Sequence, residues 1–324
     1  MKELEIRPKE LFDRYLELSR MDGTRMDPKL FVEISCPACG TEERYPQFKK
    51  DGYHYVRCSA CGSVYCSPRP TDAQLSTLYR ESESAIFWAE IFFPAVAEVR
   101  REKMFRKKAL KLVSVLNEKS LMPSTICDVG AGYGLFLEEL QKLLPDVRLS
   151  AVEPDPRLAD RCREKGFETL EKYVADSGEW SGCFDLVISS EVVEHVFSPL
   201  EFLRSIQALV APGGTALITG LGYEGFDILL LQERSNAISP PHHLNFLSLS
   251  GFERVFARAG FNSVEVITPG ELDIDIVRNM PQCPELIRVA ALRGERALSE
   301  LQGWICRNRM SSHLWASGRK PSGQ

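Results

Sequence analysis

Long hydrophobic runs are absent from the 324 residues: apolar segments such as FDLVISS are far shorter than the roughly 20 residues that a membrane-spanning helix needs. An excess of positive charge is also absent, because 40 Lys and Arg residues stand against 45 Asp and Glu residues, for a net charge of −5. The global basic field typical of nucleic-acid-binding proteins is therefore missing. The first residues alternate charges at helical spacing without an apolar leader segment, so we expect a cytoplasmic protein.

Ten cysteines are present, and four of them fall in two C-x-x-C-G segments, CPACG and CSACG. In each segment two thiolates on a tight turn can reach one ion, and the glycine lets the turn close. Two such segments complete a tetrahedral site, so we predict a structural Zn²⁺ bound by Cys36, Cys39, Cys58 and Cys61. The other cysteines are scattered, which argues against a secreted disulfide framework. The stretch around the quartet is nearly neutral, which favours a structural or substrate-covering role over RNA binding.

The chain divides by composition into three parts. Residues 1–70 combine a helical start with a Cys-, Gly- and Tyr-rich stretch of β-hairpin character, the expected zinc ribbon. Residues 71–120 form a helical linker or lid that opens with an N-cap at Thr71 or Asp72. In residues 121–324, short apolar runs alternate with helices, which predicts a parallel α/β sheet with right-handed crossovers. We expect a helical insertion at about 271–310 and a last strand in SHLWASGRK.

A glycine-rich loop follows the first strand of the α/β part, in ICDVGAGYG. Its glycines let the backbone pass close to a ligand. Glu153 ends the next strand, where a carboxylate can accept hydrogen bonds from both hydroxyls of a ribose. Dinucleotide-dependent dehydrogenases share such a loop, so it does not decide the function by itself. The deciding element is FDLVISSEVVEHV, followed by a helix and the turn APGG.

Together and in this order, these motifs resemble those of the class I S-adenosylmethionine-dependent methyltransferases, over about residues 125–270 and 311–320. The resemblance implies a Rossmann-like seven-stranded α/β sheet with a terminal antiparallel strand, and S-adenosylmethionine as the cofactor; it disfavours a dehydrogenase. It places around that cofactor Asp128, Gly130, Ala131, Gly132, Glu153, Pro154, Ser190 and Glu191.

The segment SPPHHLNFLS contains two of the five histidines, in the loop where this fold builds its acceptor pocket. It resembles the segment Y-H-E-H-x-x-Y-F-S of zinc-containing methyltransferases that act on nucleotide-linked sugars. That resemblance implies His243 as the general base, since a neutral imidazole can take a hydroxyl proton near pH 7. It also suggests His242, Asn245 and Tyr223 as acceptor contacts. The two tyrosines of the pattern are replaced here, which favours O- or N-methylation over carbanion chemistry.

Two alternatives stay open for the histidine pair, namely a structural loop and a metal site, although a metal site lacks an evident third ligand. His195 in EVVEH is a further catalytic candidate or a hydrogen-bonded histidine at a helix start. The segment VRREKMFRKKALK has seven basic residues and one acidic residue. Such runs are usually solvated helix faces, but this one could offer cations to a diphosphate or to an anionic membrane surface.

These features predict an S-adenosylmethionine-dependent methyltransferase that methylates a hydroxyl of a small-molecule or sugar acceptor. The acceptor is expected to be nucleotide- or lipid-linked, in polysaccharide or natural-product biosynthesis. One alternative is an RNA methyltransferase whose ribbon holds RNA, which the acidic composition disfavours. The other is a non-catalytic scaffold, which the intact cofactor motifs disfavour.

Overall fold

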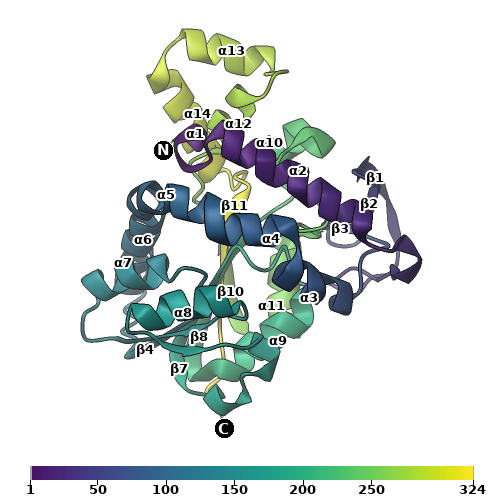
Figure 1. Cartoon of the computed structure of the whole chain (residues 1–324). Helices are drawn as coiled ribbons and strands as arrows, with labels where there is room; N and C mark the ends of the chain where they lie inside the picture. The colour runs from purple at the N-terminus through teal and green to yellow at the C-terminus, as the bar shows by residue number, and fades with distance from the viewer. Residues whose placement is uncertain (1, 324) are drawn as a thin grey trace.

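The computed structural model describes residues 2–323 and has an α/β sheet at its centre (Figure 1). The strands of this sheet are β4 (Thr125–Val129), β5 (Arg148–Val152), β6 (Glu168–Leu170), β7 (Phe184–Ser190), β8 (Val210–Leu221), β10 (Asn262–Ile267) and β11 (His313–Arg319). They lie in the order β10-β11-β8-β7-β4-β5-β6. The strands from β8 to β6 run parallel, and β11 is antiparallel to both of its neighbours. The predicted seven-stranded fold, with its terminal antiparallel strand, is confirmed.

Helices cover both faces of the sheet, so successive residues of a central strand are buried on opposite sides. Val187 of β7 packs in one apolar cluster with Leu203, whereas Ile188 packs in another with Leu112. The covering helices begin at residues suited to that position: Asp155 and Ser198 accept backbone hydrogen bonds, and each is followed by proline. These helices are α7 (Leu135–Leu143), α8 (Pro156–Glu164), α9 (Pro199–Leu209) and α11 (Leu249–Arg258).

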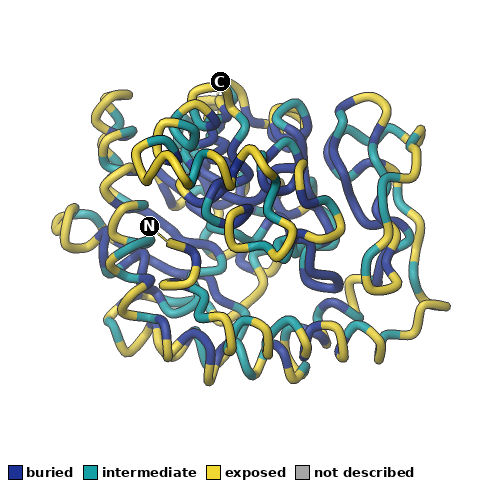
Figure 2. Tube along the Cα trace, turned by 90° about the horizontal axis from the view of Figure 1, so that it is seen from above, coloured by how far each residue is buried: buried dark blue, intermediate teal, exposed yellow. Residues whose placement is uncertain are grey.

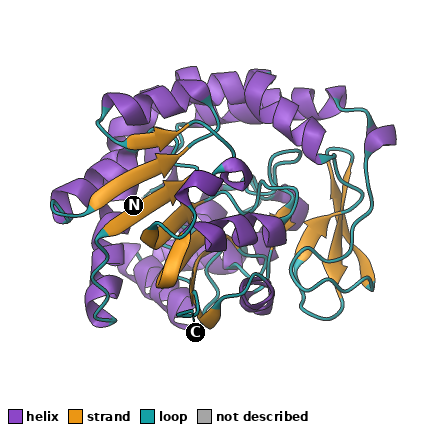
Figure 3. Cartoon of the chain, turned by 90° about the horizontal axis from the view of Figure 1, so that it is seen from below, coloured by secondary structure: helices purple, strands orange, loops and turns teal. Residues whose placement is uncertain are grey.

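A second, smaller sheet contains β1 (Arg44–Lys50), β2 (Tyr53–Cys58), β3 (Val64–Cys66) and β9 (Asn245–Phe246), in that order. Figure 3 shows it standing beside the large sheet. Its last strand comes from the α/β part of the chain, and Val64 of β3 pairs with Phe246 of β9. Cys36 and Cys58 pack in one core cluster with Phe252 of α11. The predicted boundary at residue 70 therefore divides the sequence but not the hydrophobic core.

A layer of helices covers the carboxyl ends of the parallel strands. It begins with α1 (Glu3–Ile6) and α2 (Lys9–Arg25) and continues, after the small sheet, with α3 (Asp72–Glu81), α4 (Glu83–Phe87), η2 (Trp88–Phe92), α5 (Phe93–Arg100) and η3 (Arg101–Phe105). The chain then enters α6 (Arg106–Glu118), which packs on one face of the large sheet. The predicted N-cap is confirmed, because the Thr71 hydroxyl accepts from the backbone N–H of Gln74. Figure 2 shows exposed turns along the outside of the molecule and buried stretches beneath them.

The region of the expected insertion contains three helices, α12 (Asp273–Asn279), α13 (Glu285–Leu292) and α14 (Glu295–Arg307), which join α10 (Phe226–Leu231) and α1 in one apolar cluster. Four single turns complete the helices: η1 (Pro28–Leu30), η4 (Val174–Asp176), η5 (Gly178–Trp180) and η6 (Gln232–Arg234). Among the described helices, none has the length and apolar character needed to cross a membrane.

Candidate functional site

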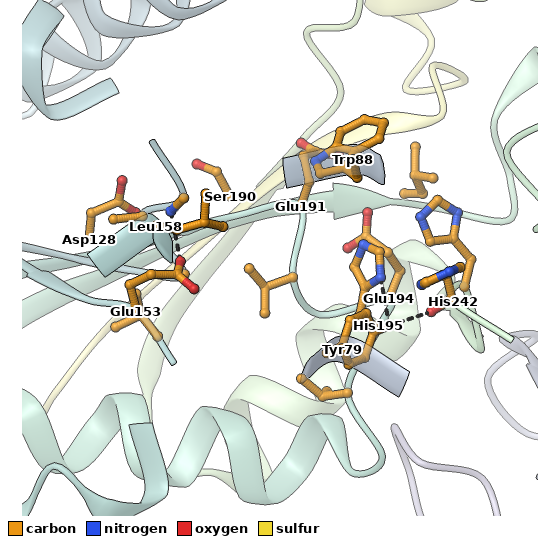
Figure 4. A pocket seen from close by; sticks show the side chains of 18 of the residues that line it. Tyr79, Trp88, Asp128, Glu153, Leu158, Ser190, Glu191, Glu194, His195 and His242 are labelled. Carbon is orange, nitrogen blue, oxygen red and sulfur yellow. Dashed lines mark hydrogen bonds between the residues drawn. The ribbon is translucent and has the colours of Figure 1, made fainter. Parts of the chain in front are cut away.

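A cavity of about 1290 Å³ lies at the carboxyl ends of the parallel strands, beneath the helical layer. Its wall comes from the loops after β4, β5 and β7, from the loop that carries the adjacent histidines, and from the helices between α2 and α6. Doubly wound sheets bind their ligands at this position. Figure 4 shows two groups of polar side chains in it, with Asp128 and Glu153 in one group and His195 and His242 in the other.

All eight residues predicted to surround the cofactor line this cavity, so the sequence motifs converge on one place. Asp128 is buried, and its Oδ1 atom has no hydrogen-bond partner. Glu153 is also buried; its two oxygens accept from the backbone N–H groups of Gly132 at 2.8 Å and of Asp155 at 3.0 Å. Burial raises the pKa of both carboxyls to about 7. Each oxygen can accept further hydrogen bonds from a ligand.

The glycine loop leaves room for a ligand because of its backbone conformation. Gly130 has φ of +75°, and a Cβ atom there would lie 2.6 Å from a methyl group of Val192. Gly132 has φ of +55°, and a Cβ atom there would meet nothing within 4 Å. The space over Gly132 and the unpartnered Asp128 oxygen fit the binding of S-adenosylmethionine.

Several cavity residues have no counterpart in the sequence predictions. Leu158 of α8 and the short turn η4, with Tyr173 before it, line the cofactor side. No sequence signal identified them, because η4 is one turn within a segment of no clear periodicity. Trp88 and Tyr79, from the helical layer, line the cavity as well.

Glu191 lies at the end of β7 in the left-handed conformation, with φ of +56°, which is uncommon for a residue with a side chain. Its carboxylate accepts from the Thr219 hydroxyl at 2.8 Å and lies 3.5 Å from the Lys108 ammonium group and 3.6 Å from the His313 ring. The neighbouring Ser190 hydroxyl has no partner. Glu191 is therefore held by groups from α6, β8 and β11 at the centre of the cavity wall.

All three candidate histidines line the cavity. The rings of His195 and His243 are 4.5 Å apart. Nδ1 of His243 lies 2.5 Å from the Ala237 carbonyl oxygen and donates to it, which leaves a lone pair on Nε2. His242 is held instead by the Ser84 hydroxyl, 2.9 Å from its Nε2. Burial lowers the pKa of His242 to about 3 and that of His243 to about 4, so both rings are neutral near pH 7.

The structure supplies the third ligand that the sequence did not reveal for a metal site. Glu194, His195 and His243 each offer an atom within 4.8 Å of the other two. One oxygen of the buried Glu194 has no hydrogen-bond partner. His195 contacts the Tyr79 hydroxyl through Nδ1, at 2.9 Å, so each of the two histidines has one ring nitrogen in a hydrogen bond, as metal-binding histidines usually have. These three side chains could hold one divalent cation.

Hydrogen bonds join the loop after β8 to the segment after β7, and they bring His243 close to Glu194 and His195. The backbone N–H groups of Leu244 and Asn245 donate to the Glu194 carbonyl oxygen. The Asn245 side chain donates to the Val196 carbonyl at 2.8 Å and to that of Val193 at 3.2 Å. The Asn245 amide nitrogen is engaged in this way, and the buried residue does not line the cavity, which corrects its predicted role as an acceptor contact.

Tyr223 does not reach the cavity either, so its predicted contact with the acceptor is also corrected. It is buried under the small sheet, where its hydroxyl lies 3.3 Å from the Gln232 side chain and its ring packs against Arg57. The pairing of β9 with β3 explains the position of Tyr223, because it holds this part of the loop against the small sheet.

The four cysteines predicted to bind metal converge in the small sheet. Their sulfur atoms lie within 4.8 Å of one another, with Cys36–Cys61 and Cys39–Cys58 at 3.5 Å. Zinc–sulfur bonds of about 2.3 Å in a tetrahedron put sulfurs about 3.8 Å apart, so the arrangement fits such an ion. Gly40 and Gly62 close the two turns, each with positive φ and an N–H donated to the first cysteine of its segment.

Comparison with known proteins agrees with the site. Residues 100–266, a little over half of the chain, match the family described as "Methyltransferase domain". A ubiquinone biosynthesis O-methyltransferase of Caulobacter sp. (strain K31) is 36% identical over 30% of this chain and 40% of its own length. A malonyl-[acyl-carrier protein] O-methyltransferase of Geobacter sulfurreducens is 26% identical over 65% of this chain and 79% of its own length.

The first of these relatives is matched over only about two fifths of its length. Among solved structures, the plantazolicin methyltransferase BamL, in complex with a triazolic desmethylPZN analogue and S-adenosylhomocysteine, has a TM-score of 0.50 and 13% identity over 76% of this chain and 94% of its own. That likeness shows the fold. With the family match and the converging motifs, it follows that this chain belongs to the methyltransferase-domain family.

Proposed function

We propose that the chain transfers a methyl group from S-adenosylmethionine to a hydroxyl oxygen of a small-molecule acceptor. The observation that carries this proposal is that the glycine loop, its two carboxylates and the cluster of Glu194, His195 and His243 line one cavity. The cofactor, when bound, supplies an electrophilic methyl group. The two relatives named above are both O-methyltransferases, which supports oxygen as the atom methylated.

Asp128 and Glu153 would hold the amino-acid and ribose parts of the cofactor, and His243 would take the proton from the acceptor hydroxyl. Its Nε2 is free to do so, because Nδ1 is engaged by the Ala237 carbonyl. Burial, and after it the charge of Glu191, raises the pKa of the Glu194 carboxyl. The imidazolium formed on His243 would lie near this group and would favour its ionised form. His242 and His195 would shape the acceptor side, since hydroxyl groups of Ser84 and Tyr79 hold them in place.

A second mechanism is favoured by the distances within the same cluster. A divalent cation held by Glu194, His195 and His243 would lower the pKa of a bound hydroxyl and align its oxygen. In that case His243 orients the acceptor rather than taking its proton. The low pKa of His243, about 4, makes it a weak base but suits it to bind a cation as a neutral ligand.

The acceptor is proposed to contain a flat or apolar part. Aromatic side chains line the cavity from the helical layer, namely Phe12, Tyr15, Trp88, Phe93 and Phe105. A nucleotide-linked sugar, as the sequence resemblance implies, has such a part in its base, and a phenol has one in its ring. For the cysteine quartet we propose Zn²⁺ with a structural role, because thiolates prefer that ion and all four positions are filled by protein.

The test begins with calorimetric titration of the zinc-loaded protein with S-adenosylhomocysteine. Methyl transfer to a panel of nucleotide sugars and catechols is measured next. We expect micromolar binding of S-adenosylhomocysteine, and a loss of about 10²–10⁴ in kcat for His243→Ala with unchanged cofactor affinity. His54→Ala is the matched control, since His54 is exposed in β2. Failure of the wild-type protein to bind S-adenosylhomocysteine would contradict the proposed function.

The same test separates the two mechanisms when Mn²⁺ binding is followed by electron paramagnetic resonance. Hard cations avoid a thiolate site, so the cysteine quartet does not interfere. Under the cation mechanism, the wild-type protein binds one Mn²⁺, Glu194→Gln loses it, and the rate depends on added cation. Under the base mechanism, added Mn²⁺ does not change the rate of methyl transfer, and its resonance signal stays that of the free ion.

A further inference from the structure

Arg100, the last residue of α5, is a buried cation without a counter-ion. Its side chain is only 6% exposed and lies at the wall of the cavity. Three aromatic rings surround its guanidinium carbon, at 5.1 Å from the ring centre of Trp88, 5.7 Å from that of Phe92 and 5.4 Å from that of Phe93. Its Nε atom has no hydrogen-bond partner, and no carboxylate within residues 2–323 forms an ion pair with it. Such a group is costly to bury unless a ligand pairs with it.

Arg7 reaches the same region from the segment between α1 and α2. It lines the cavity, and its guanidinium lies 5.3 Å from the ring centre of Phe12. Its Nε atom is buried and unpartnered, and Glu3, at 4.0 Å, is only at the limit of an ion pair. Phe12 lies 6.2 Å from Phe92, one of the rings around Arg100, so both guanidinium groups border one aromatic cluster. Burial, and after it the charge of Arg7, lowers the pKa of Arg100 to about 9.

Three lysines of the same wall differ, because protein groups already pair with them. Lys107 pairs with Glu271 at 2.7 Å, and Lys103 pairs with Glu5. Lys108 donates to the Thr219 hydroxyl at 2.7 Å and lies 3.5 Å from Glu191.

Of the seven basic residues in the segment noticed in the sequence, four form ion pairs, namely Arg101, Lys103, Lys107 and Lys108. Arg80 and Lys111 line the cavity without an ion pair among residues 2–323, but both are exposed to solvent. The less exposed cations of this wall without a close ion pair are Arg7 and Arg100.

We infer that Arg7 and Arg100 bind a carboxylate or phosphate group of the methyl acceptor. Two guanidinium groups offer planar, paired N–H donors that match either anion, and the surrounding rings suit a flat part of the same molecule. The acceptor side is indicated because Trp88, one of the rings around Arg100, packs 4.9 Å from the ring of Tyr15, which in turn lies 5.8 Å from the ring of His242. This inference rests on the proposed function and deepens it: the acceptor is an acid or a phosphate ester whose hydroxyl faces the histidine cluster.

The test measures anion binding to the full-length protein saturated with S-adenosylhomocysteine. The probes are inorganic pyrophosphate, 3,4-dihydroxybenzoate and the neutral methyl ester of that acid. We expect at least one anion to bind about tenfold or more tightly than the ester, as a charge-assisted hydrogen bond implies. Arg100→Met and Arg7→Met should each abolish this preference. Arg106→Met is the control, because Arg106 is exposed on α6 and does not line the cavity. No preference for any anion in the wild-type protein would overturn the inference.

The cofactor has a carboxylate of its own, which could be the anion that the arginines bind. A second titration distinguishes this carboxylate from an anionic group of the acceptor. S-adenosylhomocysteine is compared with 5′-methylthioadenosine, which lacks that group. Unchanged affinity of Arg100→Met for S-adenosylhomocysteine supports the acceptor and also shows that the variant is folded. A loss of about tenfold for S-adenosylhomocysteine alone would assign the site to the cofactor and overturn the acceptor assignment. If Arg100→Met fails to fold, Arg7→Met gives the same comparison. Absence of any S-adenosylhomocysteine binding to the wild-type protein contradicts the proposed function instead.

Discussion

At the scale of single residues, the two carboxyls of the cofactor side couple ligand binding to pH. Burial raises the pKa of Asp128 and of Glu153 to about 7. In the unliganded protein, raised carboxyl pKa values favour the folded state at low pH, and this contribution is lost as pH rises through about 7. Hydrogen-bond donors of a bound cofactor favour the ionised carboxylates, so binding lowers these pKa values and releases protons.

We therefore expect S-adenosylhomocysteine to bind about tenfold more weakly at pH 6 than at pH 8. Calorimetry in two buffers of different ionisation enthalpy measures the protons released. Asp128→Asn should reduce both the pH dependence and the proton release. An affinity that is constant from pH 6 to pH 8 would contradict this account.

The predicted cofactor residues could be identified from sequence because they belong to local motifs, in which spacing determines position. His243 and His195 were identified separately, but their contact with Glu194 depends on backbone hydrogen bonds from Leu244 and Asn245 across some fifty residues. The residue composition and the motif spacing of a sequence do not reveal tertiary contacts of this kind. The same reason explains the two wrong acceptor contacts and the absence of Arg7 from the sequence predictions. Arg100 belongs to the basic segment that the sequence analysis considers for a diphosphate, but its ring of aromatic neighbours is a tertiary feature.

At the scale of elements, the glycine loop has two conformationally unusual positions with different neighbours. Alanine at Gly130 would clash with Val192, whereas alanine at Gly132 would project into open cavity space. We expect Gly130→Ala to lower the melting temperature and Val192→Ala to rescue it in the double variant. Gly132→Ala should cost only about 1–2 kcal/mol of stability for its left-handed backbone but abolish measurable binding of S-adenosylhomocysteine.

Thermal melts and titrations of the three variants check this contrast. Normal cofactor affinity in Gly132→Ala would show that the space over the loop is not the cofactor site. Equal melting temperatures for Gly130→Ala and the double variant would exclude the clash with Val192 as the cause.

Elements with a strong period were predictable, and short ones were not. The parallel strands, the helical insertion and the last strand agree with the sequence pattern because each has apolar residues at the appropriate spacing. The strand β9 has two residues, and it exists only because β3 lies beside it. No local signal could reveal such a strand or the merging of the ribbon with the α/β part.

At the scale of the whole molecule, the cysteine quartet supports the main core rather than an appendage. Cys36, Cys58 and Cys61 pack in the cluster that includes Phe252 and Val255. Removal of a structural zinc costs several kcal/mol, so we expect Cys36→Ala to lower the melting temperature by at least about 5 °C in one cooperative transition. Cys183→Ala is the matched control because Cys183 is exposed and lies outside the quartet. Calorimetric melting and zinc content are the measurements, and two separate transitions in Cys36→Ala would contradict a shared core.

The pairing of β3 with β9 has a thermodynamic consequence. The strand that follows the second cysteine segment is joined to the strand that follows His243, so ordering of either one favours ordering of the other. We therefore expect a metal bound by the cysteine quartet to increase the affinity of the histidine loop for an acceptor. By thermodynamic reciprocity, a bound acceptor must increase the affinity of the quartet for its metal by the same factor. It must therefore slow the dissociation of that metal or speed its binding.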